Sequence, residues 1–226
     1  MLIIKMNNYF VILAAGKSKR FHNNTAKQLY FYKNKEIIEH SIEKSLKSRL
    51  FKKIIIVTNN LNYFKKKGYP KIVSVISGGK ERSDSSLKAL KYIKKYKPNN
   101  VFIHDAARPN FSIKLLKKIK KYLKKNIAVV PAISSKDSIK YKVKKQIFNL
   151  NRDNSLLTQT PQAFRFKELY KLAVKEKSKV SDESTLFLNQ NHKVKFISGE
   201  NQNYKITYLD DAKTPKTYFG IGFDIH

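Results

Sequence analysis

The stretch "YFVILAAGKSKRF" (residues 9–21) decides the fold, because an apolar run ends abruptly in small residues and a cation-rich loop. Consecutive apolar residues over 9–15 predict a strand that is covered on both faces. Gly-Lys-Ser at 16–18 has the letters that end a P-loop, but Val11 stands where a P-loop needs its first glycine. The dinucleotide-binding glycine pattern fails as well, because positions 14 and 19 are not glycine. The loop therefore offers a ligand close approach to its backbone, without either motif.

Apolar runs and helical patterns alternate through the rest of the chain. The predicted strands, including the first, lie at 9–15, 53–59, 71–77, 100–106, 127–132 and 193–198. The predicted helices lie at 36–48, 84–96, 112–124, 166–176 and 183–190. This alternation predicts an α/β fold with a mostly parallel sheet and right-handed crossovers. Ligands of such sheets bind beyond the carboxyl ends of the strands, so the loops there are where chemistry is expected.

One segment departs from this pattern. Residues 137–152 alternate with period two and lack an apolar helix face, which predicts an extended hairpin. We expect one domain with a β-arm inserted at about 134–158, packed against a second subunit. The chain has neither repeats nor low-complexity linkers.

The net charge of +32 raises the alternative of a basic nucleic-acid-binding protein. Only six of the 48 cations are arginine, however, and specific recognition of bases and phosphates favours the planar arginine fork. In 112–124 the lysines fall on the polar face of an amphipathic helix. We expect a solvated surface and no nucleic-acid partner.

Composition also limits the compartment and the chemistry. No cysteine is present, which excludes disulfides and thiolate metal sites. No apolar run approaches the roughly 18 residues that a membrane span requires, and the N-terminus lacks signal-peptide character. We expect a cytoplasmic protein without a membrane partner. The five histidines are scattered and no G-x-S-x-G elbow occurs, which disfavours hydrolytic triads and zinc proteases.

Four loops can carry chemistry. In the first, Arg20 and Lys27 can clamp a polyphosphate. The second, "SGGKERSDSS" (77–86), again allows close backbone approach. In the third, "VFIHDAARP" (101–109), Asp105 ends an apolar strand and is a natural Mg²⁺ ligand beside phosphates, or else a buried structural acid. The fourth, "NYKITYLDDA" (203–212), predicts a short strand followed by a helix cap, with the ammonium of Lys205 pointing at the site.

Together these stretches resemble the 2-C-methyl-D-erythritol 4-phosphate cytidylyltransferases of the non-mevalonate isoprenoid pathway. The matching motifs, in the family's order, are "LAAGKSKRF…AKQ", "GGKERSDSS", "HDAARP", "NR…TPQAF", "SDESTLF" and "YKIT". The resemblance covers about residues 9 to 217. It implies a Rossmann-like sheet of the nucleotidyltransferase type, a homodimer joined through the arm, and Mg²⁺-dependent transfer of CMP from CTP to the substrate phosphate.

The resemblance also assigns residues to roles. Catalytic cations around the reacting phosphates would be Arg20, Lys27 and Lys205. Contacts to CTP would come from Ala14, Ala15, Gly16, Gly79, Ser85 and Ala106. Methylerythritol phosphate would be bound by Arg108, Thr207 and, from the neighbouring subunit's arm, Ser138 and Arg152. Asp105 would hold Mg²⁺.

The sequence departs from the family pattern at four positions. Ser18 replaces the second glycine of the first loop, where its Cβ could crowd the phosphates. The other three changes preserve shape or a hydroxyl; they are Ala26 for proline, Ser138 for threonine and Leu156 for tryptophan.

The last residues, "GIGFDIH" (220–226), resemble the opening of 2-C-methyl-D-erythritol 2,4-cyclodiphosphate synthase. That resemblance implies that Asp224 and His226 are zinc ligands in a second, fused domain. Two ligands alone cannot hold a tetrahedral zinc site. We therefore expect a cytidylyltransferase domain over 1–219 and the start of a truncated cyclodiphosphate synthase domain over 220–226.

The nearest alternative is a ribitol-5-phosphate cytidylyltransferase, which shares the scaffold. That family typically shows Ala-Gly-Gly in the first loop and Asp-Ala-Val-Arg-Pro in the third. Here the two loops read Ala-Ala-Gly and Asp-Ala-Ala-Arg-Pro, which favours the methylerythritol phosphate enzymes.

Overall fold

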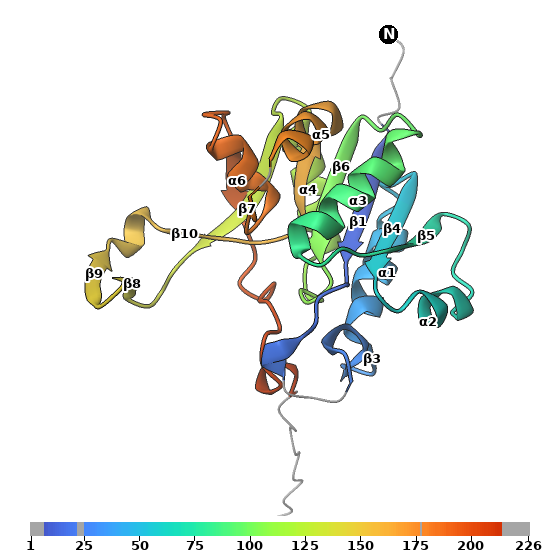
Figure 1. The fold of residues 1–226 in the computed structure, drawn as a ribbon, viewed down its shortest axis with the longest axis horizontal. Helices are drawn as coiled ribbons and strands as arrows, with labels where there is room; N and C mark the ends of the chain where they lie inside the picture. Colours follow the sequence, from blue (N-terminus) through green and yellow to red (C-terminus); the bar gives the residue numbers. More distant parts are fainter. Residues whose placement is uncertain (1–6, 22–24, 177, 214–226) are drawn as a thin grey trace, which may run out of the picture.

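The strand formed by the opening stretch lies at the centre of the sheet. The computed structural model describes residues 7–21, 25–176 and 178–213. In it, β1 (Asn8–Leu13) lies between β4 (Lys53–Thr58) and β6 (Asn100–Asp105) and runs parallel to both. β5 (Val73–Ser77) extends the sheet beyond β4, also in parallel (Figure 1). The predicted α/β fold with a mostly parallel sheet is confirmed.

Beyond β6 the sheet becomes mixed. β11 (Gln162–Arg165) runs antiparallel between β6 and β7 (Ala128–Ser134). β10 (Leu156–Thr158) pairs antiparallel with β7, and β12 (Lys195–Ser198) pairs with it in parallel. β10 and β11 were not predicted, because they are short and flank the polar segment Gln159-Thr160-Pro161.

Helices cover both faces of the sheet, which explains the continuous apolar runs of its central strands. Along β1, Phe10 and Ile12 enter one core cluster while Tyr9 and Val11 enter the other. The first cluster is covered by α1 (Ile37–Ser48), α2 (Leu61–Lys66) and α4 (Ile113–Leu123). The second is covered by α3 (Arg82–Lys94), α5 (Phe166–Lys175) and α6 (Glu183–Leu188). Every predicted helix and core strand is present, with ends within two residues of those predicted.

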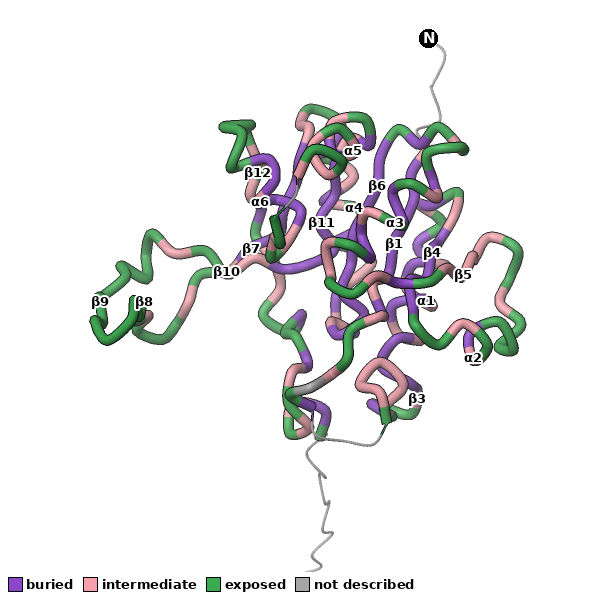
Figure 2. Tube along the Cα trace, in the orientation of Figure 1, coloured by how far each residue is buried: buried purple, intermediate pink, exposed green. Residues whose placement is uncertain are grey.

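The predicted arm is present as a hairpin. β8 (Ile139–Val143) pairs antiparallel with β9 (Gln146–Leu150) in a separate two-stranded sheet. The hairpin projects from the body of the molecule (Figure 1), and it is exposed along nearly its whole length (Figure 2).

The prediction of a short strand in 203–212 was wrong. This segment is irregular backbone beside the pocket at the strand ends, and it ends in a 3₁₀ turn, Asp210–Ala212. Its one backbone bond to the third loop runs from Ile206 N–H to the Ala107 carbonyl, 2.9 Å, which is too little for a ladder. The Ile206 side chain is buried in one cluster with Ile37 and with Tyr32 of the hairpin formed by β2 (Phe31–Tyr32) and β3 (Lys35–Glu36), so packing holds the segment in place.

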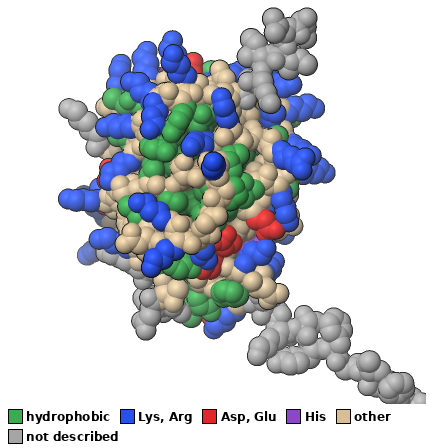
Figure 3. All heavy atoms as spheres, turned by 90° about the vertical axis from the view of Figure 1, so that its right-hand side faces the viewer, with side chains coloured by type: hydrophobic (Ala, Val, Ile, Leu, Met, Phe, Trp, Pro, Cys, Tyr) green, Lys and Arg blue, Asp and Glu red, His purple; other side chains and the backbone are tan. Residues whose placement is uncertain are grey.

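The face of the molecule in Figure 3 is basic, but its cations do not form a single stripe. In Figure 3, Lys and Arg side chains are scattered over the visible face among apolar and uncharged groups. No helix within the described ranges has the length and apolarity to cross a bilayer. The cytoplasmic location stays a prediction.

Candidate active site

A pocket of about 520 Å³ opens at the carboxyl end of β1 and β6. The register pairs Leu13 with Asp105, which brings the first and third loops side by side. Its cationic lining residues are Lys17, Arg20, Lys27, Lys80, Arg82 and Lys205, and its acidic ones are Glu81 and Asp105. An excess of cations in a concave site suits a polyanionic ligand.

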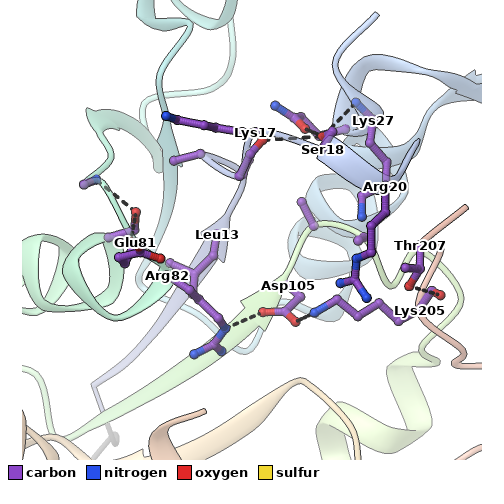
Figure 4. Close-up of a pocket in the computed structure, with 18 of the residues that line it drawn as sticks. Leu13, Lys17, Ser18, Arg20, Lys27, Glu81, Arg82, Asp105, Lys205 and Thr207 are labelled. Atoms are coloured by element: carbon purple, nitrogen blue, oxygen red, sulfur yellow. Dashed lines mark hydrogen bonds and ion pairs between the residues drawn. The ribbon is translucent and has the colours of Figure 1, made fainter. Parts of the chain in front are cut away.

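Most of the residues proposed from the sequence meet in this pocket. Its lining includes Ala14, Ala15, Gly16, Arg20, Lys27, Gly79, Ser85, Asp105, Ala106, Lys205 and Thr207. They come from loops that follow different strands and from the irregular segment 203–212. Figure 4 shows Lys27, Arg20 and Lys205 on one side, Glu81 and Arg82 on the other, and Asp105 between them.

Packing holds the first two loops together. A Cβ on Gly78 would lie 2.2 Å from the Ala15 Cβ, so only glycine allows this approach. Asn59 Nδ2 also donates to the Ala15 carbonyl at 3.0 Å. At Gly16, by contrast, an added Cβ would meet nothing within 4 Å. The protein's own packing therefore does not require glycine there, and the backbone is open to a ligand.

The hydroxyl of Ser85 shapes the Gly79 loop. It accepts the Gly79 N–H at 2.9 Å and donates to the Glu81 carbonyl at 3.1 Å. The side chain is buried at the start of α3. Its first effect is therefore to fix the loop backbone that lines the pocket.

Ser18 joins the two parts of the cation-rich loop. Its backbone is left-handed, with φ of 53°, a conformation that favours glycine. Its hydroxyl accepts the backbone N–H of Lys27 at 3.2 Å. The side chain that could have crowded a ligand thus bonds to the segment that carries Lys27.

Ser18→Ala and Ser18→Gly should separate these two features. Both lose the hydroxyl bond, but only glycine relieves the left-handed backbone, a relief of about 1 kcal/mol. We expect the free energy of unfolding in denaturant to be about 1 kcal/mol higher for the glycine variant than for the alanine variant. Equal stability of the two variants would show that residue 18 does not keep this conformation.

Lys27 is the most enclosed of the three proposed catalytic cations. Burial lowers its pKa, and the positive charges of Lys205 and Arg20 lower it further. These cations repel one another in the free protein, and a polyphosphate between them would remove that repulsion. The three cations together therefore favour the binding of an anion between them.

Asp105 ends β6 at the floor of the pocket with both oxygens engaged. Its Oδ1 accepts Arg82 Nε at 2.9 Å, and its Oδ2 accepts Lys205 Nζ at 2.7 Å. Burial alone would raise the pKa of this carboxyl, but the charges of Arg82 and Lys205 outweigh burial and hold the pKa well below its usual range. The group is therefore a carboxylate at any physiological pH.

One carboxylate beside a polyphosphate site fits Mg²⁺, which takes one or two carboxylates and completes its shell with phosphate oxygens and water. In the part of the chain that the structure describes, no three or more His, Asp or Glu side chains are grouped so that they could hold a metal ion by themselves. A metal here would share its ligands between Asp105 and the nucleotide.

Arg82 was missed by the sequence analysis, although it lies in a quoted motif. The two charges of Glu183 and Asp105 more than offset burial and raise its pKa. It is one of only six arginines in a lysine-dominated chain. An arginine in a chain whose cations are mostly lysine could have indicated that this position needs the planar guanidinium group.

Three of the proposed substrate ligands do not line the pocket. Arg108 donates from Nη1 to the Asn203 carbonyl at 2.8 Å and from Nη2 to the Thr158 carbonyl at 3.2 Å. It thus clamps the segment 203–212 to the base of the arm. Ser138 and Arg152 are exposed on the arm, where Arg152 Nη1 donates to the Lys136 carbonyl at 3.2 Å. Asp224 and His226 lie outside the described residues.

A family model for 2-C-methyl-D-erythritol 4-phosphate cytidylyltransferases matches residues 9–220. The chain belongs to this family. A cytidylyltransferase from Thermosipho melanesiensis is 35% identical over 215 residues, covering 90% of this chain and 94% of that protein. The bifunctional enzyme IspD/IspF of Pelagibacter ubique is 46% identical over 224 residues, and this chain spans 60% of its length.

Solved structures of the cytidylyltransferase family share the fold. The 4-diphosphocytidyl-2C-methyl-D-erythritol synthase of Anaerococcus prevotii superposes with a TM-score of 0.80 at 28% identity, over 92% of this chain and 93% of that chain. The bifunctional IspDF of Campylobacter jejuni gives 0.80 at 29% identity, over 91% of this chain and 53% of that one. These matches confirm the resemblance drawn from the motifs, and they favour neither the ribitol phosphate enzymes nor a nucleic-acid-binding protein.

Proposed function

We propose that this chain transfers CMP from CTP to 2-C-methyl-D-erythritol 4-phosphate, releasing pyrophosphate. The observation that carries the proposal is the set of three cations, Arg20, Lys27 and Lys205, gathered around one carboxylate in a pocket at the strand ends. Family membership supplies the substrates. The proposal places this step in cytoplasmic isoprenoid biosynthesis.

The chemistry needs alignment and charge compensation. An oxygen of the sugar phosphate attacks the α-phosphorus of CTP, and the bond from that phosphorus to the bridging oxygen of the β-phosphate breaks. Pyrophosphate leaves with the bonding electrons, and the new product is a diphosphate. The attacking phosphate is already deprotonated, so no general base and no covalent enzyme intermediate are required.

The residues of the pocket suit this task. The open backbone of Ala14, Ala15 and Gly16 would hold the nucleotide, with Gly79, Ser85 and Ala106 around it. Arg20, Lys27 and Lys205 would neutralise the phosphates and bind most tightly as charge accumulates in the transition state. Mg²⁺, when bound, would be held by Asp105 and phosphate oxygens and would neutralise further charge on the leaving group.

Pyrophosphate release tests the substrate assignment. With CTP and Mg²⁺ in excess, we expect turnover with methylerythritol phosphate and little with ribitol 5-phosphate. Turnover restricted to ribitol 5-phosphate would overturn the proposal.

We also propose that two copies of the chain associate through the arm. Large apolar side chains are exposed on and beside it, namely Tyr141, Val143, Ile147, Phe148, Leu150, Leu156 and Leu157. A hairpin with this much exposed apolar surface is typical of an interface. Ser138 and Arg152 of one copy would then reach the sugar phosphate in the pocket of the other.

The arm proposal predicts the behaviour of an Ile147→Lys/Phe148→Lys variant. Charges on the hairpin should shift the sedimentation coefficient from that of a dimer to that of a monomer. We expect kcat/KM for the sugar phosphate to fall with it, because the partner's Arg152 leaves the site. A Tyr122→Lys variant, on α4, serves as the control. A monomeric wild-type protein with full activity would contradict the proposal.

A fused cyclodiphosphate synthase domain is a further part of the proposal. It rests on the bifunctional relative and on the resemblance of residues 220–226, where Asp224 and His226 would contribute to a zinc site. Zinc content of the longer protein tests it.

A further inference from the structure

Two charged residues that have no role so far in the proposed chemistry, Arg82 and Glu183, meet next to Asp105. Arg82, from the motif at 77–86, is the first residue of α3, and Glu183, from the motif at 181–187, is the first residue of α6. Arg82 Nη1 donates to Glu183 Oε1 and Nη2 to Glu183 Oε2, both at 2.9 Å. This is the bidentate fork geometry that fixes a guanidinium in orientation as well as position.

Both helix starts are held firmly. Asp182 caps α6 by accepting the Thr185 N–H, and its Oδ2 also accepts Gln162 Nε2 at 2.9 Å. Glu81 and Asp84 form a reciprocal capping box at the start of α3. A cation at the first position of a helix opposes the helix dipole, so α3 gains nothing locally from Arg82. The position of Arg82 is therefore explained by a partner outside α3.

The two carboxylate oxygens of Asp105 are bonded to cations that differ in burial. Arg82 is largely buried and tied to Glu183, whose side chain is only 3% exposed. Lys205 is 39% exposed and lies on an irregular segment. The bond at Oδ1 therefore belongs to a rigid network, while the bond at Oδ2 can be exchanged without disturbing the core.

Resting on the proposed function, we propose that Glu183 is a positioning residue: it keeps Arg82 edge-on to Asp105, so that only Nε reaches the carboxylate. One oxygen of Asp105 then stays fixed, and the other is released when Lys205 moves to a phosphate. Without the negative charge of Glu183, Arg82 would turn its fork onto Asp105, occupy both oxygens and displace Lys205.

Glu183→Gln tests this directly, because glutamine keeps the shape and removes the charge. We expect kcat to fall about 10- to 100-fold, because Arg82 then occupies both oxygens of Asp105. KM for CTP should change less than about threefold, since the cations that bind phosphate remain. We also expect Lys205 to react several-fold faster with an amine acylating reagent in the free protein, as followed by peptide mass spectrometry. The acylation rate needs no substrate, so it tests the network even if the proposed reaction is wrong.

Arg82→Lys gives the second measurement, in case Glu183→Gln does not fold. A lysine keeps the charge but cannot bridge both carboxylates, so it should pair with the more buried Glu183. Asp105 would then depend on Lys205 alone, and Lys205 should react no faster than in the wild type, while kcat still falls at least tenfold.

Glu36→Gln is the matched control. Glu36 is a buried carboxylate at the start of α1 that accepts bonds from Tyr63 and Lys67, away from the pocket. It should lower stability without changing kcat or the acylation rate. The proposal is overturned if a folded Glu183→Gln keeps kcat within threefold and leaves Lys205 reactivity unchanged. If that variant does not fold, kcat within threefold of wild type for Arg82→Lys overturns it.

Discussion

Lys27→Ala and Lys205→Ala are each expected to lower kcat/KM by about a hundredfold or more, the effect of removing one fixed group that stabilises transition-state charge. Neither change should unfold the protein. Burial and two neighbouring cations already lower the pKa of Lys27, so its removal relieves repulsion in the free protein. Lys205 is partly exposed, and Asp105 keeps its bond from Arg82 when Lys205 is removed.

The measurement is steady-state turnover beside denaturant unfolding of the same preparations. Lys17→Ala is the matched control, because Lys17 lies in the pocket lining but is exposed, and the cations bonded to Asp105 are Arg82 and Lys205. It should change kcat/KM less than about threefold. If the Lys27 and Lys205 variants turned over at rates close to that of the wild type, these cations would not stabilise the reacting phosphates as proposed.

Asp105→Asn is expected to have the largest effect, a loss of about a thousandfold in kcat, since the stabilisation by a bound metal amounts to several kcal/mol. The variant removes the only carboxylate on the floor between the cations in the described pocket. Binding of CTP without Mg²⁺ should be retained or tightened, because Lys205 loses its competing partner. Titration calorimetry with and without Mg²⁺ measures both.

The same variant has a consequence for acid stability. Because Arg82 and Lys205 hold the pKa of Asp105 far below its usual range, this carboxylate stabilises the fold above about pH 4. That contribution is lost as the pH falls through the range between the unfolded and folded pKa values. Asp105→Asn should therefore be less sensitive to acid than the wild type. A variant with unchanged Mg²⁺-dependent turnover would remove Asp105 from the proposed metal site.

The parallel core could be predicted because its strands are apolar on both faces, as in residues 9–13 and 101–103. The position of Asp105 followed from the same reasoning, since the end of a buried strand fixes where the next side chain lies. β11 could not be predicted, because its antiparallel insertion depends on which strands it meets.

Site residues could be predicted where the sequence of a single loop indicates their role. They could not be predicted where residues far apart in the sequence act together. Lys205 reaches the pocket although its predicted strand does not form, because Ile206 packs into the core next to it. Arg82 and Glu183 lie 101 positions apart, and only the meeting of two helix starts brings them together. Two nitrogens of Arg108, which the resemblance assigns to the substrate, are engaged by backbone carbonyls that the sequence does not mark.

We propose that this pocket joins two phosphate esters by displacing pyrophosphate. Phosphorus-31 NMR of the chain incubated with CTP, Mg²⁺ and methylerythritol phosphate tests it most directly. We predict that the monoester signal of the sugar phosphate disappears as a coupled pair of diphosphate signals and one equivalent of pyrophosphate appear. An unchanged sugar phosphate signal, with active protein and intact CTP, would contradict the account.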